Sequence, residues 1–320
     1  MRFYFLFVLL AGASYALAST AGALAVTAVW RAGARRLERT SSDARARCLA
    51  AYRLAPVLGG LASVAVVGGV YWRLEPRDTS ETAGPLLLLL AAASAVMPLA
   101  GCARLAEAVR RTRACVRLAR ACGQRPPAGS GFAGWILDTP APVAALVGIL
   151  SPRILLSRRI VDTCSTAEVD LIVRHEKAHL RRRDNLVRAL LESLPDPLTF
   201  TSEGRRLVDA WAAATEQAAD DEAAGADMAA RADLAAALVR VAGLADDRPS
   251  FAISGPAFYE GEHLERRVHR LLQPPIADRR RGSGVILLAL AGCGIAAVVF
   301  TDAAATSIHD VMESVVARLA

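Results

Sequence analysis

Four long apolar runs constrain the fold of this chain most strongly. They cover residues 3–30, 54–72, 84–103 and 284–304, and each is about as long as the ~20 residues that cross a bilayer as a helix. The chain is 54% hydrophobic with a mean hydropathy of +0.33, which is more than a soluble domain of this size usually carries. The runs predict a mainly α-helical protein with four transmembrane spans in a lipid bilayer.

The first run has an alternative interpretation as a cleavable signal peptide. Arg2 precedes the run, and Ala16-Leu17-Ala18 resembles a cleavage site. The apolar residues nevertheless continue to Trp30, and a cluster of arginines follows the run instead of preceding it. This order favours a retained first span.

The arginines also predict an orientation in the cell membrane. The loop after the first run and both ends of residues 104–283 are rich in arginine, whereas the loop after the second run mixes two arginines with three acidic residues. By the positive-inside rule, the N-terminus lies outside and residues 104–283 lie in the cytoplasm. The net charge of +7 therefore indicates cytoplasmic membrane loops, and we expect no direct nucleic-acid binding because no compact basic and aromatic motif appears.

This orientation divides the chain into four parts. Residues 1–103 form a three-span region, 104–283 a cytoplasmic α+β domain, 284–304 the fourth transmembrane helix, and 305–320 a short extracytoplasmic tail. Within the cytoplasmic domain, a basic amphipathic segment extends to Cys122, and a segment rich in Gly and Pro follows it. Short apolar runs punctuated by prolines then predict strands at 135–137, 143–149 and 154–156.

A metal-binding motif lies on the helix predicted next, from residue 166 to about 182. Ser165 and Glu168 fit a capping box at its start. The motif is His175-Glu176-Lys177-Ala178-His179, and residues four apart share one face of a helix, so both imidazoles are able to bind one zinc ion. In this motif the Glu176 carboxylate acts as general base on a water molecule that zinc acidifies.

A catalytic zinc site needs a third protein ligand. No third histidine follows at metzincin spacing, so the candidate is a carboxylate on a second helix, in residues 211–222. Glu216 and Asp220 are four apart there and share a face. We expect Glu216 to bind zinc and Asp220 to hydrogen-bond a ligand imidazole. An acidic, solvated helix face is the alternative interpretation of this segment.

The combination of motifs resembles the BlaR/MecR-type integral-membrane antirepressor metallopeptidases. The matching pieces are Pro152–Leu156, His175–His179, Arg182–Asn185, Glu216–Glu222 and Leu264–Val268. The resemblance implies a gluzincin-like domain between spans three and four, with His175, His179 and Glu216 as zinc ligands, Glu176 as catalytic acid and base, and Asp184 and Asp220 as supporting residues. It also implies endoproteolysis of a cytoplasmic protein, either the chain itself or a winged-helix repressor, after a signal.

The sequence departs from that family after the fourth run. Only residues 305–320 follow, and no penicillin-binding sensor domain or Ser-x-x-Lys motif is present. We therefore do not expect direct covalent sensing of a β-lactam. Two other functions remain open: a quality-control or CAAX-type membrane zinc protease, and a signalling scaffold without activity. His263, His269 and Tyr259 are candidates for stabilising an oxyanion, although surface positions are commoner for such residues.

Overall fold

The computed structural model describes residues 2–76, 83–127, 131–244 and 261–276, together with a few positions between 306 and 314. The predicted fourth span, residues 284–304, lies outside the described residues, as does Tyr259. Most of the described residues are helical, as the sequence predicts.

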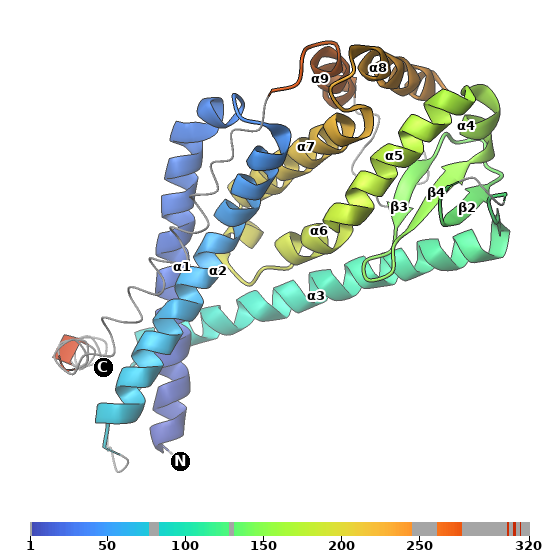
Figure 1. Cartoon of the computed structure of the whole chain (residues 1–320). Helices are drawn as coiled ribbons and strands as arrows, with labels where there is room; N and C mark the ends of the chain where they lie inside the picture. Colours follow the sequence, from blue (N-terminus) through green and yellow to red (C-terminus); the bar gives the residue numbers. More distant parts are fainter. Residues whose placement is uncertain are drawn as a thin grey trace.

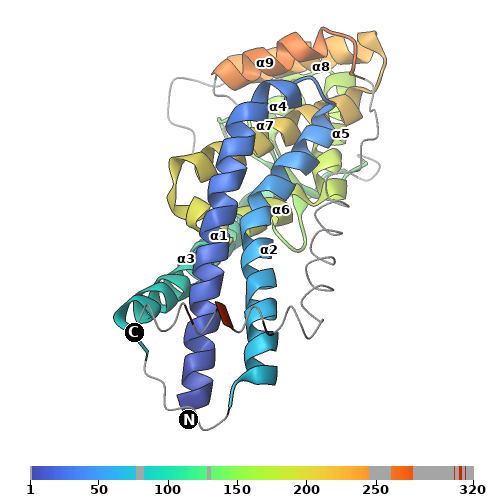
Figure 2. The same cartoon turned by 90° about the vertical axis from the view of Figure 1, so that its left-hand side faces the viewer.

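Three long helices contain the first three apolar runs. They are α1 (Arg2–Leu37), α2 (Ser42–Leu74) and α3 (Pro85–Cys122), and each is long and apolar enough to cross a membrane. Helices α1 and α2 pack side by side as a hairpin, and α3 leaves this pair and runs beneath the rest of the molecule (Figures 1 and 2). Large apolar side chains on these helices face outward, as expected where lipid covers them.

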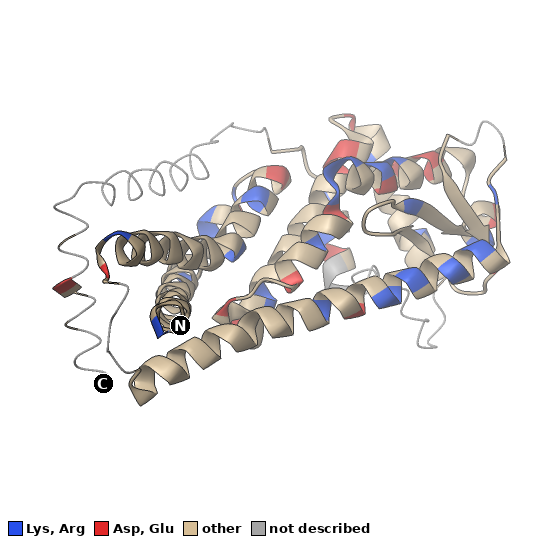
Figure 3. Ribbon diagram, turned by 90° about the horizontal axis from the view of Figure 1, so that it is seen from below, with Lys and Arg blue, Asp and Glu red and all other residues tan. Residues whose placement is uncertain are grey.

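The predicted basic segment up to Cys122 is not a separate element, because it continues α3 without a break. The apolar first half of α3 carries no charge, whereas arginines line its second half (Figure 3). Alanine, leucine and arginine are all strong helix formers, so the change from apolar to basic residues does not end the helix. The predicted domain boundary at residues 103–104 therefore lies within one helix, where its side chains change from apolar to basic.

A small four-stranded sheet follows α3. Its strands are β1 (Gly123–Gln124), β2 (Gly134–Leu137), β3 (Ala144–Val147) and β4 (Arg153–Ser157), in the order β1-β2-β4-β3. Strands β2 and β4 pair in parallel, and the other two pairs are antiparallel. The three predicted strands are confirmed, with ends that differ by one to a few residues. A side chain at Gly134 would collide with the carbonyl oxygen of Ile154, so only glycine fits there.

Helices cover both faces of this sheet. Ile154 and Leu156 pack against α5 (Thr166–Arg182), with α4 (Arg158–Thr163) and α8 (Met228–Gly243) beside it. Leu155 points to the opposite face and packs against Ala119 of α3. The period-two alternation of β4 thus places the sheet between α3 and α5 (Figure 1).

The remaining helices join the sheet region to the hairpin. They are α6 (Asp184–Glu192), the 3₁₀ helix η1 (Pro197–Phe200), α7 (Ser202–Ala224) and α9 (Gly261–Leu271). Trp211 of α7 and Leu191 of α6 share one buried core with Leu49 of α2. Two buried residues strengthen this junction, because Arg53 of α2 forms an ion pair with Asp196 before η1.

Two further contacts connect the first turn of α2 to α7. The Ser42 hydroxyl donates to the Asp221 carboxylate at 2.8 Å, and the Arg45 guanidinium donates to the Gln217 side chain. Glu216 and Asp220 lie on the same helix, one residue away from these contacts. The tip of the α1–α2 hairpin therefore rests directly on the helix that carries the predicted third ligand.

Candidate metal centre

Helix α5 presents the predicted histidines because of its start and its apolar face. Ser165 accepts from the Glu168 backbone, and the Glu168 carboxylate accepts from the Ser165 backbone, so the predicted capping box is confirmed. Ile172 and Val173 pack toward the sheet. The motif residues then lie toward α7, and all three of its functional side chains are buried, with Glu176 only 1% exposed.

Helix α7 supplies the facing carboxylates. The Thr201 side chain caps its first turn by accepting from the Gly204 backbone. Small residues on the inner face, such as Ala219, let the backbones of α5 and α7 approach closely. Glu216 and Asp220 extend from this face toward α5, as their spacing of four residues predicts.

The three predicted ligands converge on one point. The Nε2 atoms of His175 and His179 are 3.1 Å apart, and the Glu216 carboxylate oxygens lie 3.4 Å from the first and 3.5 Å from the second. Two nitrogens bound to zinc at about 2.05 Å with tetrahedral angles would be roughly 3.3 Å apart. The observed triangle therefore has the dimensions of a zinc site.

The outer nitrogens of both imidazoles are held by carboxylates. His175 Nδ1 lies 2.9 Å from Asp220, and His179 Nδ1 lies 2.7 Å from Asp184. An ionised carboxylate only accepts, so each Nδ1 carries a proton, and a ring that binds a metal would turn the lone pair of Nε2 toward it. Two lone pairs at this distance beside a carboxylate repel unless a cation lies between them. The donor set thus fits a divalent metal such as zinc.

A tight turn brings Asp184 to His179. Arg183 adopts the left-handed conformation, with φ 56° and ψ 38°, and ends α5 while α6 starts at the next residue. This conformation costs a residue with a side chain roughly 1–2 kcal/mol. The left-handed residue changes the direction of the chain between the two helices, and the Asp184 carboxylate in the first turn of α6 lies 2.7 Å from Nδ1 of the last histidine of the motif.

Arg267 is a part of this site that the sequence did not single out. Its guanidinium donates through Nε and Nη2 to the two oxygens of Asp220, at 2.8 and 2.7 Å, and Nη1 lies 3.2 Å from Glu216. The side chain is buried. The sequence signal for this residue is its place in Leu264–Val268, a segment that carries part of the family resemblance.

The charges of the site influence each other strongly. Burial raises the pKa of Glu176, which makes this carboxylate a stronger base. Burial opposes ionisation of Asp220 as well, but the Arg267 guanidinium outweighs it and lowers the pKa of Asp220 to about 2. Burial by itself would lower the pKa of His179, yet the Glu216 and Asp184 carboxylates raise it to about 10. The carboxylates around His175 and His179 thus favour a positive charge at the imidazoles.

Glu176 retains an unused oxygen. Among the described residues, nothing hydrogen-bonds to its buried Oε1 atom. A buried carboxylate oxygen without a partner is costly, so it usually has a ligand to bind. Because Glu176 lies next to the three converging ligands, this oxygen is able to hold a water molecule and to accept its proton.

Of the other candidates, only the side chain of His269 is described. His269 is exposed at the end of α9 and lies near Gln273 instead of the motif. The side chain of His263 lies outside the described residues, as does Tyr259.

A comparison with protein-family models supports the predicted resemblance over part of the chain. Residues 134–196 match the model of the BlaR1 peptidase, M56. The BlaR/MecR resemblance is confirmed. The matched segment begins at β2, contains His175, Glu176, His179 and Asp184, and ends before α7. M56 peptidases are metallopeptidases, which agrees with the converging histidines and Glu216. No curated protein and no solved structure matches the chain.

Proposed function

We propose that this chain is a membrane-embedded zinc endopeptidase that cleaves a cytoplasmic protein in a signal-responsive pathway. The observation that carries the proposal is the convergence of His175, His179 and Glu216 beside the unpartnered oxygen of Glu176. A scaffold without activity has no need for a buried carboxylate that lacks a partner. The M56 match supports the peptidase class independently of this geometry.

The residues of the site have separate tasks in such a reaction. A bound zinc ion would polarise the scissile carbonyl and acidify a water molecule. Glu176 would accept the proton of the attacking water and pass it to the leaving amine, and its raised pKa suits both steps. Asp184 and Asp220 fix the tautomer of each imidazole, so that Nε2 always faces inward.

The proposed setting is the cell membrane, with the N-terminus outside and the site facing the cytoplasm. Three apolar helices support the membrane location, and the arginines after the first and third apolar runs support this orientation. A reporter enzyme that is active only in the cytoplasm tests it. Fused after residue 37, within the first loop, it should be active, whereas in the loop at residues 77–82 it should be inactive.

The proposed substrate is a winged-helix repressor or the chain itself. The repressor is best sought in the gene beside this one. Purified full-length protein is incubated with that repressor, and both partners are followed by mass spectrometry for new termini. A Glu176→Gln variant should keep its zinc and lose about 10²–10⁴-fold in cleavage rate. If the wild type contains no zinc, or if both proteins cleave equally, the proposal is wrong.

Two outcomes would redirect the proposal without removing the peptidase. Cleavage of misfolded membrane proteins, and not of the repressor, would indicate a quality-control protease. Cleavage restricted to peptides that end in a prenylated cysteine would indicate a CAAX-type protease. An unchanged cellular phenotype in Glu176→Gln cells would instead favour the scaffold.

A further inference from the structure

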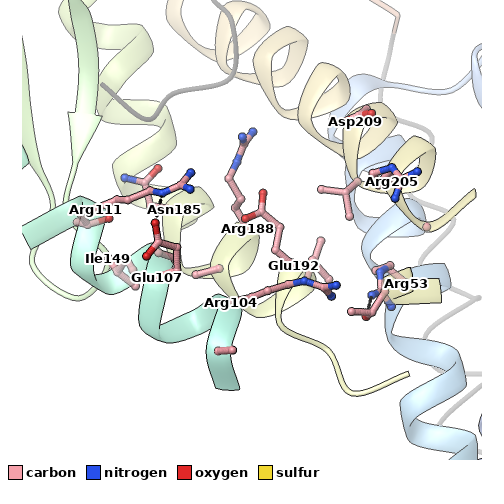
Figure 4. A pocket seen from close by; sticks show the side chains of 18 of the residues that line it. Arg53, Arg104, Glu107, Arg111, Ile149, Asn185, Arg188, Glu192, Arg205 and Asp209 are labelled. Atoms are coloured by element: carbon pink, nitrogen blue, oxygen red, sulfur yellow. Dashed lines mark hydrogen bonds and ion pairs between the residues drawn. The ribbon is translucent and has the colours of Figure 1, made fainter. Parts of the chain in front are cut away.

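A cavity beside the second half of α3 is separate from the metal centre. It measures about 750 Å³ and lies between α3, α6, α7 and the end of β3. None of the predicted metal ligands lines it. Its wall carries five arginines and three carboxylates, and Figure 4 shows Arg104 from α3, Arg188 from α6 and Arg205 from α7 around it.

Glu192 is an acidic neighbour of Arg104 and Arg188 and interacts with their charges at longer range than an ion pair. In the part of the chain that the structure describes, none of these three arginines forms an ion pair. Arg104 lies over the ring of Phe200 at 5.3 Å, and Arg188 lies over the ring of Trp211 at 5.8 Å, so aromatic faces hold two of them in place. The other two arginines differ, because Arg53 pairs with Asp196 and Arg111 pairs with Glu107.

Helix α3 places this cavity at the level of the lipid headgroups. Arg104 is the first charged residue after the apolar run of α3, and Ala108 and Arg111 follow on the same face. Just before it, Gly101 lets the turn after α6 pack against α3, since a side chain there would collide with the carbonyl oxygen of Ser193. The cavity therefore begins where the membrane-spanning part of α3 ends.

The cavity combines charge with apolar surface. Leu146, Val147 and Leu198 line it beside the arginines, and Phe200 is half exposed next to Arg104. Leu99, about one turn before the cavity, is 70% exposed on α3. An inorganic anion would use only the guanidinium groups, whereas a phospholipid would also cover these apolar side chains.

We propose that this cavity binds the phosphodiester headgroup of an anionic phospholipid, with Arg104, Arg188 and Arg205 around the phosphate. Guanidinium groups bind phosphate oxygens through paired, charge-assisted hydrogen bonds. The acyl chains would then leave along the exposed apolar side of α3. Because Glu192 and Asp209 also line the cavity, its excess of positive charge suits one headgroup and not a polyanion.

The test uses full-length protein purified in a neutral detergent. Short-chain phosphatidylglycerol, short-chain phosphatidylcholine and sodium phosphate are titrated separately, and binding is measured by native mass spectrometry and by the shift in Tm. We expect phosphatidylglycerol to bind at least about tenfold more tightly than the other two. The Arg104→Gln/Arg205→Gln double variant should lose about tenfold or more of that affinity.

A matched double variant separates a built site from general basicity. Arg113 and Arg117 lie on the same helix, are exposed, and do not line the cavity. Arg113→Gln/Arg117→Gln removes the same charge and should change the affinity less than about threefold. Circular dichroism and zinc content show whether both variants fold. Equal losses in the two folded variants would overturn the proposal, as would a wild type that prefers sodium phosphate or binds both lipids equally.

Discussion

Replacing Arg267 with lysine tests how the metal centre is held in shape. Arg267 grips both oxygens of Asp220 and also touches Glu216, whereas lysine offers one point charge without the planar fork. An uncharged substitute would confuse two effects, because it would also remove a cation that repels the metal. Arg267→Lys keeps the charge and removes only the geometry.

The expected size of the effect follows from these contacts. Loss of the fork frees Asp220, which orients His175, and frees Glu216, which is itself a proposed ligand. Loss of one such supporting contact typically lowers metal affinity 10–100-fold, and we expect Arg267→Lys to fall in this range. Zinc affinity is measured by competition with a chromophoric chelator, and the absorption spectrum of the Co²⁺-substituted protein reports the ligand geometry.

Arg231 provides the control for this experiment. It is also a fully buried arginine of the same domain, but it donates to the backbone carbonyls of Arg270 and Leu271 and pairs with Asp221. Arg231→Lys should lower Tm and leave zinc affinity within about threefold. If Arg267→Lys binds zinc as tightly as the wild type and keeps its Co²⁺ spectrum, Arg267 does not position the ligands.

Three further predictions concern stability. The pKa of Asp220 is about 2 in the folded protein, below the unfolded value of about 3.9, so its ionised form stabilises the fold above about pH 4. This contribution disappears as the pH falls toward 2. The Tm of Asp220→Asn should therefore fall less steeply than that of the wild type between pH 4 and pH 2. Gly101→Ala places a methyl group 2.2 Å from a carbonyl oxygen and should cost about 1–3 kcal/mol in thermal unfolding, whereas Gly59→Ala, with open space around it, should have little effect. Asp196→Ala leaves Arg53 buried without its carboxylate and should cost about 3–5 kcal/mol, measured by unfolding in detergent.

The sequence predicted those parts of the molecule that local patterns determine. The capping box at Ser165 and the apolar positions of α5 fix that helix, and the motif spacing then fixes which side chains share a face. The same logic placed Glu216 and Asp220 together on α7. Apolar run lengths predicted the three described spans, and the short strands followed from apolar segments between prolines.

Long-range pairings were beyond such patterns. Arg267 reaches Asp220 from a different helix, 47 residues away in sequence, and nothing in the local pattern distinguishes it from Arg266. Arg53 lies in a basic loop by sequence, yet the structure buries it against Asp196. Both pairings depend on how the helices pack against each other. The spacing of residues along one helix predicts only which face of that helix a residue occupies.

The contact between the N-terminal end of α2 and α7 limits how the protein can be divided into fragments. Helix α2 packs against one side of the core around Trp211, and Ser42 and Arg45 of α2 hydrogen-bond to the helix that carries Glu216. A fragment that starts at residue 104 would lack α2 and would expose the apolar side chains of this core to water. We therefore expect that the domain with the metal centre must be expressed and purified together with α1 and α2.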